Sequence, residues 1–321
     1  MSVIEKANAL EAAGRHHEVV ALIENSARAG ESEALYVLAN WRLWGQNGAR
    51  DLAAAHDLLK EAGARGYREA ILLQATLIAN GNGVPADWAG GLQLLRSISA
   101  YAPARRQLTL LEAMQLGSDG EPLSVPCADH VSDRPQVMHA VGFLTRDECT
   151  YLMEAATPRL EPSSVVDKQG RRIPHPVRTS EGTSFGPAHE DLLVHAVNKR
   201  IAALTATQVN WGEPLHMLRY RPGQQYRPHL DLIPGETNQR TLTALLYLND
   251  GYQGGETQFT EAGLTIPTRA GDAIVFHNLK TDGHRDSSSK HAGLPVISGI
   301  KWVATRWIRS GPYHPWGLQP P

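Results

Sequence analysis

Apolar positions in the first third of the chain recur with a period of 36 residues. Pairs of branched aliphatic residues begin at positions 22, 58 and 94, and glycines at 45, 81 and 117 keep the same step. Within a period, apolar side chains follow helical spacing, which predicts helices over 33–44 and 51–62. Asp51 and Asp87, one period apart, are suited to cap the first turn of a helix. The pattern therefore predicts a repeated pair of short helices.

A helix pair of this length cannot bury its apolar face alone, so it must stack on the next pair. This predicts an α-solenoid over residues 1–118, with about two full repeats, a partial first repeat and a closing helix near 103–116. The repeats resemble SEL-type repeats, which are relatives of the tetratricopeptide repeat. Such a domain either offers a concave surface to a peptide or protein, or packs against the rest of the chain and stabilises it. The sequence leaves both roles open.

The pattern changes after residue 118. Residues 119–136 are rich in Gly, Ser, Asp and Pro, which predicts a linker. In the domain expected over 137–321, Thr145 and Glu148 have the spacing of a capping box for a helix that extends to about Ala156. Strand-like runs follow over 241–249, 272–279 and 296–308. Short strands separated by turn residues favour a sandwich or jelly roll, so the whole chain is expected to have an α+β fold.

Composition argues against several classes of function. Lys and Arg number 31 against 33 Asp and Glu in 321 residues, and no charged block stands out, so we expect neither nucleic-acid nor membrane binding. The N-terminal residues lack the apolar run of a signal peptide, and no stretch is long and apolar enough to span a bilayer. Cys127 and Cys149 are too few for a disulfide framework and are expected to be reduced thiols. These features predict a cytoplasmic protein.

Three His-x-Asp triplets lie in the second half of the chain: His189–Asp191, His229–Asp231 and His284–Asp286. In a strand, residues i and i+2 point to the same face, so such a triplet could offer a nitrogen and a carboxylate to one metal ion. The first triplet falls in a helical pattern and the third in a Gly-, Asp- and Ser-rich loop, whereas His229 ends a predicted extended segment. His291 follows Asp231 by 60 residues and could complete a 2-His-1-carboxylate set, which suits non-haem Fe(II).

A lysine interrupts one of the apolar runs. Lys301 lies in the sequence GIKWV, where a buried ammonium group needs a partner or loses its charge. Lys301 and Trp307 are an even number of residues apart, so their side chains face the same way in a regular strand. A dicarboxylate molecule would supply the partner that this lysine needs.

Seven stretches of the second domain form a specific set: FLTRDEC (143–149), VRTSEGTSF (177–185), LRYRPGQQYRPHLD (218–231), TALLYLN (243–249), GGETQF (254–259), GDAIVFHNL (271–279) and HAGLPVISGIKWVATRWIR (291–309). In their order and spacing, the region from about 137 to 312 resembles the prolyl 4-hydroxylase branch of the 2-oxoglutarate dioxygenases. The resemblance covers a little over half the chain. It implies a double-stranded β-helix, or jelly-roll, dioxygenase domain.

The resemblance also implies a role for individual residues. His229, Asp231 and His291 match the iron ligands, and Lys301 matches the partner of the distal carboxylate of 2-oxoglutarate. The hydroxyl groups that match further contacts to that carboxylate belong to Tyr220 and Thr257. The structural alternatives are that Tyr220 is an ordinary core aromatic and that Thr257 is a strand residue without a specific role.

Other matching positions line the site of the target proline in the family that the region resembles. These positions are Tyr226, Arg240 and Trp307. Arg178, with Thr179 and Ser180, matches a loop that closes over a peptide. The structural alternatives are a core aromatic for Trp307 and a solvated surface side chain for Arg240.

The implied reaction uses Fe(II), 2-oxoglutarate and O2, with ascorbate as reductant, and releases succinate and CO2. Because Asp231 is present, hydroxylation is favoured over halogenation, whose enzymes in the wider superfamily usually lack this carboxylate. The expected substrate is a prolyl residue of a peptide or protein, which the helical repeats could also contact.

Three alternatives compete with a peptidyl prolyl hydroxylase. One is a hydroxylase of a free amino acid or small metabolite on the same scaffold. A nucleic-acid demethylase is disfavoured by the near-neutral charge and by Lys301, where we would expect arginine. A non-catalytic scaffold built on the repeats would be expected to have a broken set of metal ligands, whereas His229, Asp231 and His291 are all present.

Overall fold

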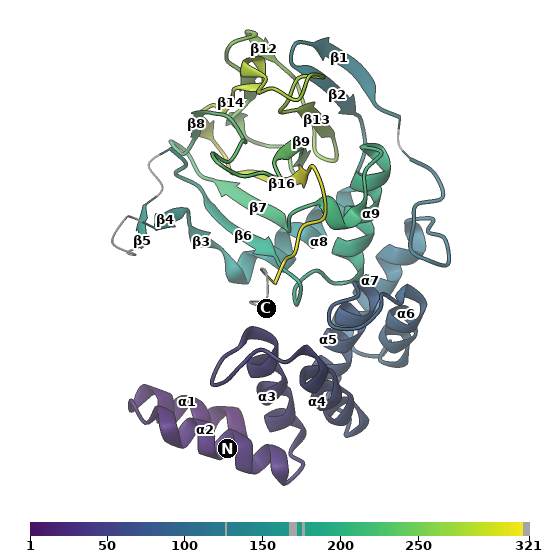
Figure 1. Ribbon diagram of the computed structural model, residues 1–321, viewed down its shortest axis with the longest axis vertical. Coiled ribbons are helices and arrows are strands. Elements are labelled where there is room, and N and C mark those ends of the chain that lie inside the picture. Colours follow the sequence, from purple (N-terminus) through teal and green to yellow (C-terminus); the bar gives the residue numbers. More distant parts are fainter. Residues whose placement is uncertain (126, 167–171, 175–176, 317–321) are drawn as a thin grey trace. The chain divides into compact units, whose positions relative to one another are not determined.

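The fold of this protein, seen in a computed structural model, consists of two compact units (Figure 1). The structure describes residues 1–125, 127–166, 172–174 and 177–316. Unit 1 comprises Met1–Glu121 and Pro187–His195, and unit 2 comprises Pro122–Gly186 and Ala196–Pro321. Within the predicted linker 119–136, residue 126 lies outside the described residues. The linker also contains a strand, β1 (Asp129–Asp133), which pairs with its neighbour β2 (Gln136–Ala140), so part of the linker has regular structure.

Unit 1 is built from the predicted helices. They are α1 (Val3–Ala12), α2 (His16–Arg28), α3 (Ser32–Trp44), α4 (Leu52–Ala64), α5 (Arg68–Ala79), α6 (Trp88–Ser97) and α7 (Ala102–Ala113). Asp51 and Asp87 accept hydrogen bonds from the backbone N–H groups of Ala54 and Gly90, so both predicted caps are present. Gly45 ends α3 with φ 67°, a left-handed conformation that only glycine adopts without strain.

The short segment Pro187–His195 belongs with the helices of unit 1. The Asn80 side chain donates to the Glu190 carbonyl at 2.6 Å, and the His195 ring stacks on Trp88. Helix α9 (Leu192–Leu204) begins only after Asp191, whose carboxylate accepts from the Val194 N–H at 3.0 Å. The prediction that the triplet His189–Asp191 lies inside a helix is therefore wrong, because its aspartate is used as a cap at the helix start.

Unit 2 contains two sheets that form the jelly roll. The larger sheet has the strand order β1 (Asp129–Asp133), β2 (Gln136–Ala140), β13 (Ala273–His277), β9 (Arg240–Tyr247), β16 (Lys301–Arg309), β7 (Leu215–Tyr220), β6 (Glu181–Phe185) and β3 (Glu161–Pro162). The smaller sheet has the order β12 (Leu264–Thr265), β11 (Thr257–Phe259), β14 (His291–Gly293) and β8 (Tyr226–His229). Two short pairs complete the strands: β4 (Ser164–Val166) with β5 (Arg172–Pro174), and β10 (Gln253–Gly254) with β15 (Val296–Ser298).

The predicted strands over 241–249 and 272–279 are present as β9 and β13. The run over 296–308 is not one strand, because β15 ends at Ser298 and β16 begins at Lys301. Gly299 lies between them with φ 76°, and a Cβ atom there would lie 2.4 Å from the carbonyl oxygen of Gly251. The interruption lets β15 pair with β10 while β16 enters the larger sheet between β7 and β9.

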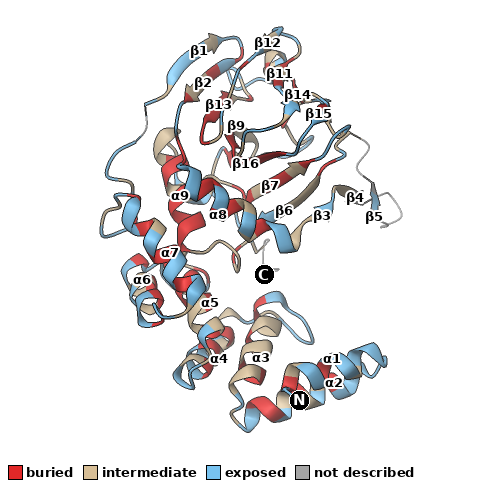
Figure 2. Cartoon of the chain, turned by 180° about the vertical axis from the view of Figure 1, so that it is seen from behind, coloured by how far each residue is buried: buried red, intermediate tan, exposed pale blue. Residues whose placement is uncertain are grey.

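Within unit 2, buried residues concentrate on the central strands of the larger sheet and on the helices (Figure 2). The predicted helix is α8 (Arg146–Ala156), with the capping box of Thr145 and Glu148 formed. Glu148 also pairs with Arg200 of α9 at 2.8 Å, and both side chains are buried. Because a buried charge is costly unless it is paired, this contact fixes the two helices relative to each other.

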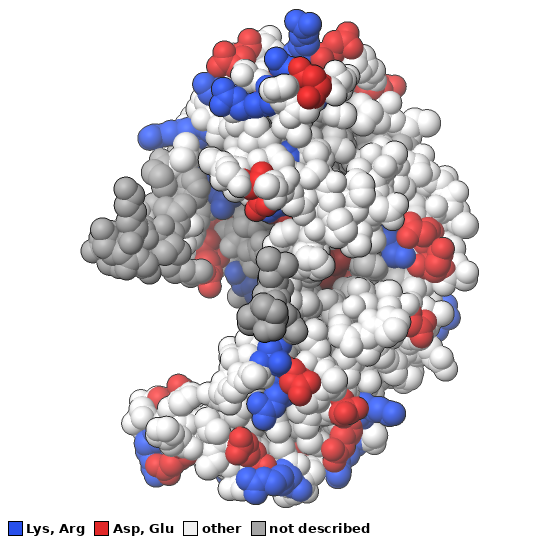
Figure 3. Space-filling model, viewed as in Figure 1, with Lys and Arg blue, Asp and Glu red and all other residues white. Residues whose placement is uncertain are grey.

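Surface charge of both signs is interspersed on the face drawn in Figure 3. Within the part of the chain that the structure describes, no helix has the length and apolar character needed to cross a bilayer.

Candidate metal and co-substrate site

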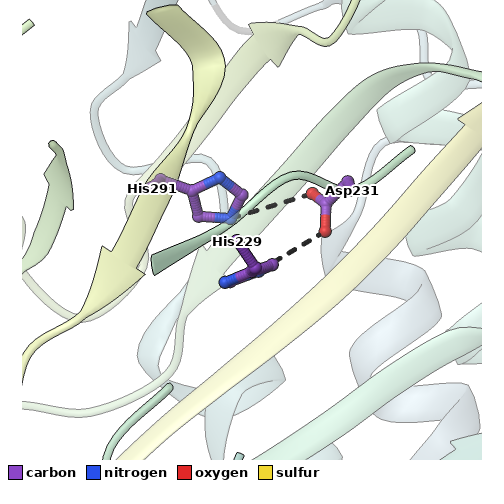
Figure 4. A group of neighbouring side chains, drawn as sticks. All are labelled: His229, Asp231 and His291. Atoms are coloured by element: carbon purple, nitrogen blue, oxygen red, sulfur yellow. Dashed lines mark ion pairs between the residues drawn. The ribbon is translucent and has the colours of Figure 1, made fainter. Parts of the chain in front are cut away.

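Three side chains from two distant segments of the chain converge in unit 2 (Figure 4). His229 is the last residue of β8 and pairs in register with His291, the first residue of β14. Asp231 follows two residues after His229. The Nε2 atoms of His229 and His291 lie 3.6 Å and 3.8 Å from the Asp231 carboxylate oxygens, and all three donor atoms lie within 4.8 Å of one another.

Both imidazoles are held in the tautomer that a metal ligand needs. The Nδ1 atoms of His229 and His291 lie 2.8 Å and 2.9 Å from the backbone carbonyls of Arg227 and Ser289. A carbonyl only accepts hydrogen bonds, so Nδ1 carries the proton and Nε2 presents its lone pair to the site. Burial lowers the pKa of His291 to about 4, which keeps this ring neutral near pH 7.

The Asp231 carboxylate is ionised and firmly held. Burial alone would raise its pKa, but the neighbouring His291 and His229 and a hydrogen bond from Thr243 lower it below its usual range. The Thr243 hydroxyl donates to Oδ2 at 2.7 Å. Two imidazoles and one carboxylate, all buried or half-buried, form a donor set that suits Fe(II) and is close enough for a single ion to contact all three.

The donor atoms face a cavity between the two sheets. Its lining comes from both sheets: Leu218, Tyr220, Tyr226, His229, Asp231, Leu245, Thr257, His291, Gly293, Lys301, Val303, Thr305 and Trp307. Lys301 and Trp307 both line it, as their even spacing on β16 predicts, and Val303 and Thr305 lie between them on the same face. Val303 and Thr305 follow from the same spacing rule, although neither belongs to a pattern that marks it as a cavity residue.

Lys301 lies in the cavity wall with 3% of its surface exposed. Its ammonium group donates to the Gly255 carbonyl at 2.6 Å and lies 5.7 Å and 5.4 Å from the ring centres of Tyr220 and Tyr247. No carboxylate of the described residues lies within 4.0 Å of it. Burial lowers the pKa of Lys301 to about 8, although the charge of Glu256 acts in the opposite direction. An anionic group entering the cavity would find a cation that no carboxylate of the described residues contacts.

Hydroxyl groups lie around this lysine. The Tyr247 hydroxyl donates to Thr257 Oγ1 at 2.8 Å, and both residues are buried. Burial raises the pKa of Tyr220 and Tyr247, so both phenols stay protonated and can act as donors. Tyr220 and Thr257 were predicted from the sequence. Tyr247 was missed because it lies in a run that reads as an ordinary buried strand.

The residues predicted at the target proline fall into two groups. Tyr226 and Trp307 line the cavity, and Tyr226 stacks on His229 with ring centres 3.5 Å apart. Arg240 and Arg178 lie over these rings, with their guanidinium carbons 3.9 Å from the Trp307 centre and 5.4 Å from the Tyr226 centre, respectively. The two arginines are thus placed to hold aromatic side chains of the cavity.

Arg240 is fixed by Glu213, a residue that no sequence pattern marks. Its guanidinium donates twice to the buried carboxylate of Glu213, at 2.6 Å and 2.7 Å, and once to the Asp231 carbonyl at 3.3 Å. The alternative of a solvated Arg240 does not match this buried pairing. Glu213 has no motif around it, and it precedes Arg240 by 27 residues.

The remaining triplet behaves as predicted. His284 lies in a turn with 82% of its side chain exposed, and its nearest acidic partner is Asp282 at 3.3 Å. Within the described residues, only His229, Asp231 and His291 form a cluster that could hold a metal ion.

Known proteins resemble this chain in the same region. A family model described as the 2OG-Fe(II) oxygenase superfamily matches residues 215–309. The chain is 33% identical over 277 residues to "Probable prolyl 4-hydroxylase 10" of Arabidopsis thaliana, which covers 78% of this chain and 96% of that relative. The chain belongs to the prolyl 4-hydroxylase family. This member is therefore an Fe(II)- and 2-oxoglutarate-dependent dioxygenase, as the resemblance implied.

Further relatives match shorter parts of the chain. The family member is 37% identical over 199 residues to "Prolyl 4-hydroxylase 1" of A. thaliana, which covers 56% of this chain and 70% of the relative. Among solved structures, the viral collagen prolyl hydroxylase of Paramecium Bursaria Chlorella virus-1 is 30% identical, covering 56% of this chain and 99% of that one, with a TM-score of 0.46. A Sel1 repeat protein from Oxalobacter formigenes is 17% identical, covering 33% of this chain and 85% of that one, with a TM-score of 0.31.

Proposed function

We propose that this enzyme hydroxylates a prolyl residue of a peptide or protein and converts 2-oxoglutarate to succinate and CO2. The proposal depends above all on one observation. A 2-His-1-carboxylate cluster and a buried lysine without a carboxylate partner among the described residues face the same cavity, in a chain of the prolyl 4-hydroxylase family. The first would hold the metal and the second would hold the co-substrate.

His229, Asp231 and His291 would hold Fe(II). When bound, the ion supplies the redox chemistry that couples decarboxylation of 2-oxoglutarate to hydroxylation of a C–H bond. The protein contributes geometry. Backbone carbonyls fix both imidazole tautomers, and Thr243 fixes the carboxylate. These contacts keep the three donors aimed at one point before the ion arrives.

Lys301 would bind the distal carboxylate of 2-oxoglutarate through a charge-assisted hydrogen bond in a site shielded from water. Tyr220 and Thr257 would add neutral hydroxyl groups from the cavity wall. Because Lys301 and His291 line the same cavity, the opposite end of the molecule would then point toward the metal. Apolar lining residues such as Leu218 and Val303 would exclude water from the reacting groups.

Tyr226 and Trp307 would form walls for the target proline, with Arg178 and Arg240 holding these rings in place. Aromatic faces suit a pyrrolidine ring, which is apolar and carries no hydrogen-bond donor. Residues 177–180 would cover a bound peptide. The Thr179 N–H donates to the Gln225 carbonyl at 3.1 Å, which places this segment beside the start of β8.

We also propose ascorbate as the reductant, a cytoplasmic location, and contact of the substrate with the helical repeats, which we regard as relatives of the tetratricopeptide repeat. Support for the location is that Cys127 and Cys149 are both free thiols. Support for substrate contact by the repeats is the general use of such domains as protein-binding surfaces.

The apparent KM for 2-oxoglutarate should depend on pH through Lys301. The carboxylate binds the protonated ammonium, and the lowered pKa of about 8 means that this form is lost above pH 8 rather than above 10.5. We expect a constant KM below pH 8 and a rise of up to about tenfold per pH unit above it, because binding then requires proton uptake. Measuring KM from pH 6.5 to 9.5 tests this, and a constant value across that range would contradict it.

The proposed function can be tested in one experiment. The purified protein is incubated with cell extract, Fe(II), 2-oxoglutarate and ascorbate, and peptides are searched by mass spectrometry for one added oxygen. His291→Ala protein, which should not hold the metal, is the control. Oxygen on prolyl residues only with the intact enzyme would support the proposal and name the target. Succinate formation without any modified peptide would favour a small-molecule substrate, and failure of the intact protein to bind Fe(II) would refute the assigned site.

A further inference from the structure

Two fully buried polar residues stand behind the metal-ligand cluster. Thr243 on β9 and Asn278, which follows β13, are both 0% exposed. Asn278 Nδ2 lies 2.9 Å from Thr243 Oγ1, and Thr243 Oγ1 lies 2.7 Å from Asp231 Oδ2. The three side chains thus form a single row of hydrogen bonds that runs from the centre of the larger sheet to the cluster.

The chemistry of these groups fixes the direction of every bond in the row. An ionised carboxylate only accepts, so the Thr243 hydroxyl must donate its single hydrogen to Asp231. The lone pairs of Thr243 are then free to accept, and the Asn278 amide must turn its nitrogen toward them. The backbone anchors Asn278, because its N–H donates to the Thr241 carbonyl and its carbonyl accepts from the Asp286 N–H.

Stability alone does not account for these two residues. Thr243 lies in the middle of a central strand, paired with Phe276 on one side and Trp307 on the other, where valine would fill the same space without a polar group. Asn278 Oδ1 is buried, and no described residue donates to it, so the amide leaves one acceptor unsatisfied. A buried unsatisfied acceptor destabilises the fold, which indicates that the amide has another use.

We propose that Thr243 and Asn278 are positioning residues that hold Asp231 as a one-oxygen ligand. This inference depends on the proposed role of Asp231 as an iron ligand. The Thr243 hydroxyl holds Oδ2, which lies 3.8 Å from His291 Nε2, and this hydrogen bond opposes rotation of the carboxylate. Oδ1, which lies 3.6 Å from His229 Nε2 and takes no hydrogen bond from Thr243, would then be the oxygen offered to the metal. Restricting the aspartate to one bond leaves more of the coordination sphere for co-substrate and oxygen.

Metal affinity tests the proposal without any catalytic turnover. The metal-free full-length protein is titrated with Mn(II) while free Mn(II) is followed by electron paramagnetic resonance. Thr243→Val, which keeps the shape and removes the hydroxyl, should bind about 10- to 100-fold more weakly. Thr243→Ser, which keeps the hydroxyl, should restore most of the affinity. The affinity of Asn278→Leu should lie between those of Thr243→Val and Thr243→Ser. In this variant the Thr243 hydroxyl remains, but it no longer accepts a hydrogen bond from the Asn278 amide.

Two further measurements separate positioning from folding. Melting temperatures of the metal-free variants show whether each one is folded, and the visible absorption of bound Co(II) reports the ligand geometry, which should change in Thr243→Val and not in Thr243→Ser. If Thr243→Val does not fold, Asn278→Leu decides the matter. Wild-type affinity and spectrum in the folded variants, or equal weakening by serine and valine, would overturn the inference. Failure of the wild-type protein itself to bind Mn(II) or Co(II) would instead refute the proposed metal site.

Discussion

Asp231→Asn should lower the affinity for Mn(II), used in place of Fe(II), by more than about 100-fold, because changes outside the ligand set already cost about 10- to 100-fold. Asp231 is 4% exposed and faces both imidazoles. Asparagine has the same shape but lacks the negative charge that offsets the charge of the ion. Metal binding and 2-oxoglutarate turnover should therefore fail together, which a Mn(II) titration and a succinate assay would measure.

Asp191→Asn is a matched control for this substitution. Asp191 belongs to the first His-x-Asp triplet and caps α9, a position where asparagine serves equally well. We expect its metal affinity and turnover to equal those of the wild type. An Asp231→Asn protein that keeps tight metal binding would show that the cluster is not the metal site. Equal losses in both variants would show that the effect is not specific to the cluster.

Features that depend on short-range rules could be predicted from the sequence. The 36-residue period located the helix pairs, and the spacing of Thr145 and Glu148 located the start of α8. The local patterns around the three His-x-Asp triplets favoured the pair of His229 and Asp231, which the structure brings together with His291, although Asp231 lies two residues past the end of β8. In each case a local pattern determines the conformation, so no knowledge of the tertiary fold is needed.

Features that depend on strand register could not be predicted in this way. Glu213 reaches Arg240 because β7 and β9 flank β16, and Asn278 reaches Thr243 because β13 and β9 are paired. Nothing in the sequence near these residues indicates their partners. The break at Gly299 was missed for a related reason, since it reflects the close approach of the Gly251 carbonyl rather than a local turn pattern.

Lys301→Met should have opposite effects on co-substrate binding and on stability. Methionine has a similar length and no charge, so the 2-oxoglutarate carboxylate would lose its cationic partner. Truncating one side of a buried charge pair costs about 2–5 kcal/mol, which corresponds to a rise in Kd of about 30-fold to several thousand-fold. Lys280→Met, at an exposed lysine, is the matched control and should leave the Kd unchanged. Calorimetric titration of the metal-loaded protein without O2 would measure both values.

Without 2-oxoglutarate, the same Lys301→Met substitution should stabilise the protein. The pKa of Lys301 is lowered from 10.5 to about 8, which corresponds to about 3 kcal/mol by which burial disfavours the ammonium in the folded state. Between pH 8 and 10.5 the unfolded chain binds more protons than the folded one, so wild-type stability rises with pH in that range. The gain from methionine should therefore be full below pH 8 and shrink toward pH 10.5, as urea unfolding at several pH values would show. A Lys301→Met protein that is less stable than the wild type at pH 7 would contradict this prediction. It would mean that a group of the protein already compensates the charge of Lys301, so that no ligand is needed to do so.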